Sequence, residues 1–156
     1  MPPAPRYHSV IAETANRLLE EFAVRRYPVN VFDLAARMGI AIEHWPFANL
    51  LGGLLFDEDG PCIFYSSNVP VTRARFTVAH ELGHFVLHRR QGIYFMCQEN
   101  SKRLAERQAN RFAAELLMPE DKVKQAYQKG QAAADMAVRF MVSLEAMLTR
   151  MTELDL

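Results

Sequence analysis

The sequence is poor in cysteine, balanced in charge and free of long apolar runs. Its two cysteines, Cys62 and Cys97, are not in C-x-x-C spacing, so we expect reduced thiols rather than a disulfide. Eighteen basic and eighteen acidic residues cancel, which argues against direct nucleic-acid binding, because that function usually requires a basic face. No apolar run approaches the roughly 18 residues of a membrane span, and no secretory signal is recognisable. We therefore expect a cytoplasmic protein that does not contact a membrane.

What the sequence does contain is enough apolar residues for one core. It has 156 residues, of which 50% are hydrophobic, and a chain of this length buries about two-thirds of its unfolded surface. We predict a single α+β domain over 1–156, mostly helical. Its expected segments are a flexible lead at 1–6, helices at 7–38, a small sheet at 40–66, two helices at 71–118 and further helices at 120–156.

The predicted sheet is antiparallel and three-stranded. Its expected strands are Ile40–Trp45, Leu50–Phe56 and Cys62–Tyr65, with an Asp-Gly hairpin turn before the last of them. Gly52 and Gly53 either allow another backbone to approach closely or ease a bend. An exposed edge here would accept an extended peptide by strand addition, which makes Gly53 a candidate substrate contact.

The predicted helix at 71–89 contains the pattern H-E-x-x-H, with His80, Glu81 and His84. Residues four apart on an α-helix point in nearly the same direction, so both imidazoles can reach one metal ion. Glu81 lies about 100° around the helix from His80. From there its carboxylate can act on a water molecule at that ion.

The residues around this pattern are mostly apolar, which indicates a buried helix. Unpaired polar groups in such a helix cost several kcal/mol, and a bound cation would remove that cost. The alternative is a buried helix whose histidines make ordinary hydrogen bonds.

Two histidines need a third protein ligand. His88 is eight residues from His80, about 12 Å along the axis, whereas zinc–nitrogen bonds are about 2 Å, so we expect it to lie too far away. The next predicted helix, 102–118, contains Glu106 and Asn110 one turn apart. One of them can bind the ion while the other orients a ligand imidazole. Glu115 is a competing ligand, although it lies about 180° from Glu106 around the helix.

Two blocks of sequence, RFTVAHELGHFVLH at 75–88 and ERQANRFAAELLMP at 106–119, resemble the ImmA/IrrE-type metallopeptidases. The resemblance extends upstream to YPVNVFDLAARMGIAIE at 27–43 and downstream to DMAVRFMVSLEAMLTRM at 135–151. It implies a zincin-like fold in which the sheet lies beside the H-E-x-x-H helix.

The resemblance also implies the site and its activity. His80, His84 and Glu106 would hold Zn²⁺, or another divalent metal, and Glu81 would be the general base of an endopeptidase. The implied substrate is a helix-turn-helix repressor or antitoxin encoded by a neighbouring gene. Apart from the resemblance, the residues themselves make Asn110 a candidate to orient a ligand imidazole, and Tyr94 and His88 candidate contacts to substrate or to the transition state.

Two other classes of function remain open from the sequence. The chain could act by binding alone, as a toxin–antitoxin-type or repressor-sequestering module with a structural metal or none. It could also bind DNA, because 131–140 and 143–154 resemble a helix-turn-helix in outline. The last helix, however, offers only Arg150 as a basic residue, whereas a recognition helix needs phosphate and base contacts. We expect that helix to pack in the core or to dock a protein partner.

Overall fold

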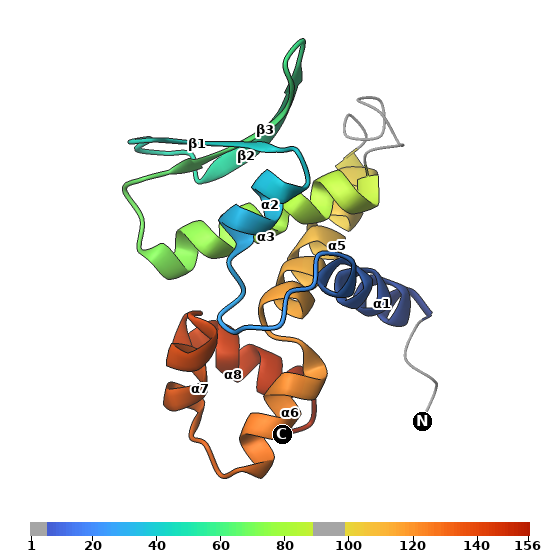
Figure 1. Cartoon of the computed structure of the whole chain (residues 1–156), viewed down its shortest axis with the longest axis vertical. Coiled ribbons are helices and arrows are strands. Elements are labelled where there is room, and N and C mark those ends of the chain that lie inside the picture. The colour runs from blue at the N-terminus through green and yellow to red at the C-terminus, as the bar shows by residue number, and fades with distance from the viewer. Residues whose placement is uncertain (1–5, 89–98) are drawn as a thin grey trace. The chain divides into compact units, whose positions relative to one another are not determined.

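The computed structural model describes residues 6–88 and 99–156, and these residues form seven helices and three strands (Figure 1). The helices are α1 (Arg6–Glu21), α2 (Val31–Arg37), α3 (Val71–His88), α5 (Glu99–Leu117), α6 (Glu120–Gln128), α7 (Ala133–Phe140) and α8 (Leu144–Glu153). The strands are β1 (Ala41–Trp45), β2 (Gly52–Asp57) and β3 (Gly60–Ser66). The predicted α+β class, mostly helical with a small sheet, is confirmed.

The described residues gather into two compact units. The first unit contains 6–30 and 114–156, and the second contains 31–88 and 99–113. The single-domain organisation expected from the sequence stays a prediction, and each unit is described by itself below. None of the described helices combines the length and the apolar character that a membrane crossing requires.

The sheet of the second unit is mixed, so the prediction of an antiparallel sheet is wrong for one of its two strand pairs. Its strand order is β1-β3-β2. β2 and β3 form the predicted antiparallel hairpin, in which Asp57 pairs with Gly60. β1 instead pairs with β3 in parallel, with Ala41 opposite Cys62. Strand-like alternation predicts that a segment is extended, but it does not identify the neighbouring strand.

β3 occupies the centre of the sheet, between β1 and β2. Its Ile63 is fully buried, whereas most of β1 is exposed. The hairpin turn has a local signal, Asp59-Gly60, with Gly60 at φ +115° and the Asp59 N–H donating to Asp57 Oδ1 over 2.9 Å. No such two-residue turn signal joins β1 to β2. The connecting residues 46–51 therefore carry the chain past β3 to the other edge of the sheet.

Helices α2 and α3 cover one face of this sheet (Figure 1). β2 comes close to α3 at Gly52, where an added Cβ would lie 2.5 Å from Thr77 Cγ2 of the helix and 2.6 Å from the Phe64 carbonyl oxygen of β3. Gly52 therefore lies too close to α3 and to the neighbouring strand for a side chain, and its approach to another backbone, such as that of a substrate, stays a prediction. β2 lies directly against α3, one helical turn before His80.

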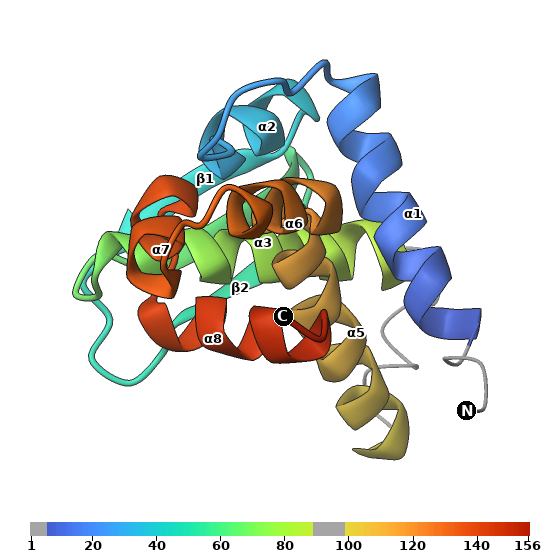
Figure 2. The ribbon, with the colours of Figure 1, turned by 90° about the horizontal axis from the view of Figure 1, so that it is seen from below.

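In the first unit, α7 packs against both α6 and α8 (Figure 2). α8 begins with Ser143, whose Oγ accepts a hydrogen bond from the Ala146 N–H over 3.1 Å. Arg150 is the one basic residue that this helix could offer to DNA. The structure buries its side chain completely against Glu115, which is also buried. Arg150 is therefore an internal ion-pair partner.

The Arg150 guanidinium contacts three residues within this unit, one of which is Glu153, with 3.4 Å between Nη1 and Oε2. It donates to both carboxylate oxygens of Glu115 and, from Nε, to the Met118 carbonyl oxygen over 3.1 Å. The bidentate geometry satisfies a charge pair that would otherwise be costly to bury. These bonds connect α8 to the end of α5.

Replacing Arg150 should therefore destabilise the protein strongly. We expect Arg150→Ala to lower the free energy of unfolding by about 3–5 kcal/mol, because the buried Glu115 carboxylate would lose its bidentate partner. Urea denaturation followed by circular dichroism measures this change. As the control, Lys124→Ala removes the exposed Lys124–Glu120 pair and should cost less than about 1 kcal/mol. Equal effects of the two substitutions would contradict the assignment.

Candidate metal centre

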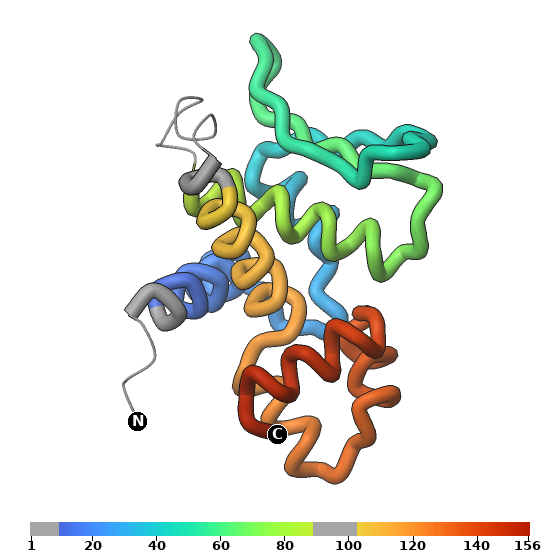
Figure 3. The backbone as a smooth tube through the Cα atoms, turned by 180° about the vertical axis from the view of Figure 1, so that it is seen from behind, coloured from blue at the N-terminus to red at the C-terminus, as the bar shows by residue number. Residues whose placement is uncertain are grey.

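The candidate site lies where α3 crosses the part of α5 that belongs to the second unit (Figure 3). Gly83 occupies the crossing point. A Cβ added to it would lie 3.0 Å from Ala109 Cα and 3.1 Å from the Ala109 carbonyl oxygen. The helices therefore approach through two of the smallest residues, glycine and alanine. The polar side chains that lie next to these two residues, or one turn before them, can then meet.

Three of those side chains converge. The Nε2 atoms of His80 and His84 lie 3.0 Å apart. One carboxylate oxygen of Glu106 is 3.2 Å from His80 Nε2, and the other is 3.2 Å from His84 Nε2. Among the described residues, these three side chains form a group whose ligand atoms all lie within 4.8 Å of one another.

The size and chemistry of this group fit a divalent cation. Ligand atoms placed tetrahedrally at the usual 2.0–2.1 Å from zinc lie about 3.3–3.4 Å from one another, close to the spacings here. Two histidines with one glutamate is also a known ligand set of catalytic zinc sites. Without a cation, unprotonated ring nitrogens and carboxylate oxygens would face each other at distances that favour repulsion.

Asn110 orients one of the two imidazoles. His80 Nδ1 lies 2.8 Å from Asn110 Oδ1, and because that oxygen only accepts, His80 Nδ1–H donates. The proton on Nδ1 leaves the Nε2 lone pair of neutral His80 directed at the group. The hydrogen-bond partner proposed for a ligand imidazole is therefore present, one helical turn after Glu106.

Burial is uneven around the group. The side chain of His84 is 9% exposed and that of His80 is 15% exposed, whereas that of Glu106 is 43% exposed. One side of the group therefore faces solvent. A cation held here would keep a position that water or substrate can reach, as catalytic rather than structural zinc sites do.

Burial also changes the proton affinities at the site. It raises the pKa of the Glu81 carboxyl to about 7, and the negative charge of Glu106 adds to this effect. Burial and, to a lesser degree, His80 lower the pKa of His84 to about 4, against the opposing attraction of Glu106. His84 is therefore neutral at physiological pH, which is the form that binds metals. Glu81 has the proton affinity expected of a group that takes up and releases a proton near neutrality.

His88 does not reach the three converging ligand atoms, in agreement with the distance estimated from the sequence. It is buried next to His84, with the two Nδ1 atoms 3.1 Å apart. Its other ring nitrogen, Nε2, lies 2.9 Å from Gln108 Oε1. Both ring nitrogens are thus engaged within the protein, which favours a supporting position over the substrate contact suggested by the sequence.

The other three residues that the sequence offered for the site are not part of the group formed by His80, His84 and Glu106 among the described residues. Glu115, the competing third ligand, is buried in the first unit and paired with Arg150. Gly53 is in β2, where an added Cβ would lie 2.5 Å from the Phe64 ring, and its contact with substrate stays a prediction. Tyr94 lies outside the described residues.

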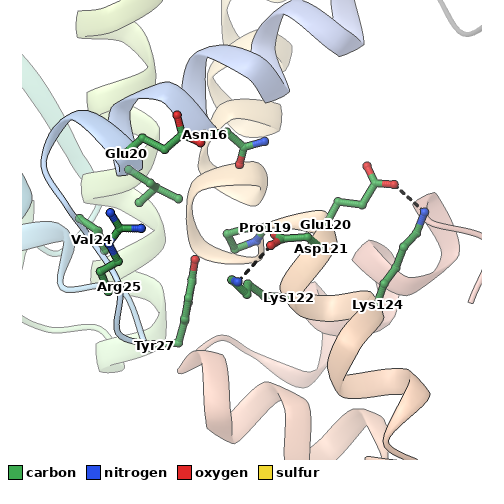
Figure 4. A pocket seen from close by; sticks show the side chains of 11 residues that line it. Asn16, Glu20, Val24, Arg25, Tyr27, Pro119, Glu120, Asp121, Lys122 and Lys124 are labelled. Atoms are coloured by element: carbon green, nitrogen blue, oxygen red, sulfur yellow. Dashed lines mark hydrogen bonds and ion pairs between the residues drawn. The ribbon is translucent and has the colours of Figure 1, made fainter.

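A separate pocket of about 590 Å³ occurs in the first unit, between α1 and α6 (Figure 4). Acidic and basic side chains both line it, and four of them pair with one another as Lys124–Glu120 and Lys122–Asp121. Burial, followed by the charge of Asp121, raises the pKa of the Tyr27 hydroxyl that lines it. The pocket contains none of the convergent ligand atoms, so it does not compete with the metal centre as the place of chemistry.

Two residues of the site were not singled out from the sequence. Gly83 carries a recognisable signal, because a glycine inside a predicted helix lowers helix stability and usually has a packing reason. Gln108 has no such signal in the sequence. It is an ordinary polar residue between Glu106 and Asn110, and only the placement of His88 makes it part of the site.

Comparisons with known proteins identify a family, a relative and a structural neighbour. The family model of the IrrE N-terminal-like domain, Peptidase M78, matches residues 35–152. A relative from Bacillus phage phi105, an uncharacterized immunity region protein, is 30% identical over 121 residues, which cover 76% of this chain and 74% of that protein. A solved structure of a Mycobacterium tuberculosis transcriptional regulator has a similar fold. It has a TM-score of 0.69 at 17% identity, and the match covers 92% of this chain but only 46% of the regulator.

The close helix crossing leads to a stability prediction. We expect Gly83→Ala to destabilise the protein by up to about 2 kcal/mol. Overpacking against the α5 backbone costs roughly 1–3 kcal/mol, and the better helix propensity of alanine returns about 1 kcal/mol. Thermal and urea denaturation measure the change. Arg73→Ala, at an exposed position of the same helix, serves as the control and should change stability by less than about 0.5 kcal/mol. A stabilised Gly83→Ala variant would show that the crossing tolerates a side chain.

Proposed function

Since the chain belongs to the Peptidase M78 family, whose hallmark is the IrrE N-terminal-like domain, we propose that it is a zinc-dependent endopeptidase of narrow specificity. The observation that carries this proposal is the convergence of His80, His84 and Glu106. Their ligand atoms come together between α3 and α5. Glu81 follows His80 directly in the sequence. We assign the three converging side chains as the metal ligands and Glu81 as the general base.

Zinc suits this ligand set best, although other divalent metals accept the same donors. When bound, the ion supplies Lewis acidity, which acidifies a water molecule and polarises the scissile carbonyl group. Glu81 takes the proton of the attacking water and then delivers it to the nitrogen of the leaving amine. Its raised proton affinity suits both steps, since it must accept a proton and then give it up.

The proposed substrate is a helix-turn-helix repressor or antitoxin from a neighbouring gene. The family membership and the relative from a phage immunity region both support a regulatory protein as the target. A single cut would inactivate such a regulator. We place this reaction in the cytoplasm, where repressors act, and propose no direct contact with nucleic acid.

The alternative is a binding module that does not cleave its partner. Such a module has no use for a general base beside the ligands, and a structural metal site generally closes its fourth position. The 43% exposure of the Glu106 side chain supports an open site. Cleavage assays separate the two functions directly.

Glu81→Gln tests the catalytic assignment. We expect this variant to bind one zinc ion as the wild type does, but to cleave the helix-turn-helix partner about 10²–10⁴-fold more slowly, because the amide cannot accept the proton. Mass spectrometry of the incubated partner measures the fragments. Glu13→Gln, the same change on the exposed surface of α1, should cleave at the wild-type rate. Full activity of Glu81→Gln would overturn the role of Glu81.

Glu106→Ala tests the third ligand. We expect this variant to lose most of its zinc affinity and all detectable cleavage, because two imidazoles alone give an incomplete site. Zinc content after dialysis and competition with a chromogenic chelator measure the affinity. Glu43→Ala, at an exposed position of β1, should leave both properties unchanged. Wild-type affinity in Glu106→Ala would mean that another group supplies the third ligand.

A further inference from the structure

The hydrogen bonds behind His84 form a short chain that neither metal binding nor proton transfer by Glu81 requires. Gln108 Oε1 lies 2.9 Å from His88 Nε2, and His88 Nδ1 lies 3.1 Å from His84 Nδ1. The chain links α5 to α3 on the side of His84 opposite to the converging ligand atoms. His88 is 7% exposed and His84 is 8% exposed, so water has little access to their shared hydrogen bond.

The chemistry of the three groups gives this chain one direction. The oxygen of the Gln108 amide only accepts, so His88 must carry a proton on Nε2. Neutral His88 then presents a lone pair on Nδ1. The proton shared by the two Nδ1 atoms must therefore come from His84. With its proton on Nδ1, neutral His84 has an unprotonated Nε2, the atom that faces His80 and Glu106.

We infer that His88 and Gln108 are positioning residues that hold His84 in the tautomer required for metal binding. Neither residue touches the metal or the substrate. Asn110 fixes the tautomer of His80 through one hydrogen bond, whereas Gln108 and His88 fix that of His84 through two hydrogen bonds in series. The inference rests on the proposed metal site, but it concerns a property that the metal-free protein already has.

The reverse tautomer shows what the chain prevents. If His88 donated from Nδ1, His84 Nδ1 would accept and its proton would sit on Nε2. That proton would point at the place where a cation must bind. Each binding event would then require a tautomer change, which lowers the affinity. Hydrogen-bond partners of metal-binding imidazoles commonly contribute about 10–100-fold in metal affinity.

Substitutions at His88 can separate the hydrogen bond from packing. His88→Leu fills the space but removes the acceptor, and we expect its zinc dissociation constant to rise about 10–100-fold. His88→Asn places an amide oxygen near the position of Nδ1 and should recover most of the wild-type affinity. His44→Leu, at an exposed position of β1, is the matched control and should bind zinc as the wild type does. Competition with a chromogenic chelator measures all four proteins.

Gln108→Leu tests the outer end of the chain with a milder change. It removes the acceptor that orients His88, so we expect a smaller loss of zinc affinity, about tenfold or less. Circular dichroism confirms that each variant is folded before its affinity is measured. Wild-type affinity in both His88→Leu and Gln108→Leu would overturn the inference. Equal losses in His88→Leu and His88→Asn would also overturn it, because packing alone would then explain them.

The tautomer itself can be observed without metal. Long-range ¹H–¹⁵N spectra of the zinc-free protein distinguish the two ring nitrogens of each histidine. We expect His84 to be protonated at Nδ1 in the wild type and to populate both tautomers in His88→Leu. Protonation of wild-type His84 at Nε2 would overturn the inference. If the wild type binds no zinc at all, the proposed function fails, and the spectra still decide whether the chain sets the tautomer.

Discussion

The contact on which the site depends is the crossing of α3 and α5 at Gly83 and Ala109. A metal centre made from two helices needs their axes close enough for short side chains to meet, and at this crossing even a methyl group would be crowded. The two histidines come from one helix and the glutamate from the other. Their convergence is therefore a property of the crossing, because neither helix could assemble the three ligand atoms alone.

The same crossing makes polar residues tolerable in a largely buried helix. His80 has a hydrogen-bond acceptor in Asn110, and His84 contacts His88, which in turn contacts Gln108. Buried polar groups without partners would cost stability. In both His80 and His84, Nδ1 has a hydrogen-bond partner within the protein, and Nε2 faces the group of converging ligand atoms. The same hydrogen bonds therefore connect the two helices and orient the histidine ligand atoms.

The sheet contacts α3 next to the metal-binding histidines. Gly52 brings β2 into contact with Thr77, one turn before the first metal-binding histidine. The hairpin of β2 and β3 was predictable, because its turn is encoded in adjacent residues. The parallel pairing of β1 with β3 was not, because β2 lies between these two strands in the sequence. The burial of Arg150 with Glu115 was also invisible in the sequence, where both look like surface charges.

The sequence by itself determined the elements that depend on local spacing. These are the helices and their approximate ends, the hairpin turn, and the orientation of His80 and His84 toward one side of their helix, since four residues make about one helical turn. Only the tertiary structure decided which partner each group meets. Glu106 and Glu115 lie on the same helix and are the same residue type, yet one faces the imidazoles and the other faces a buried arginine. That choice depends on how the faces of α5 pack against residues distant in sequence, whereas spacing within the helix shows only that the two glutamates lie on opposite faces.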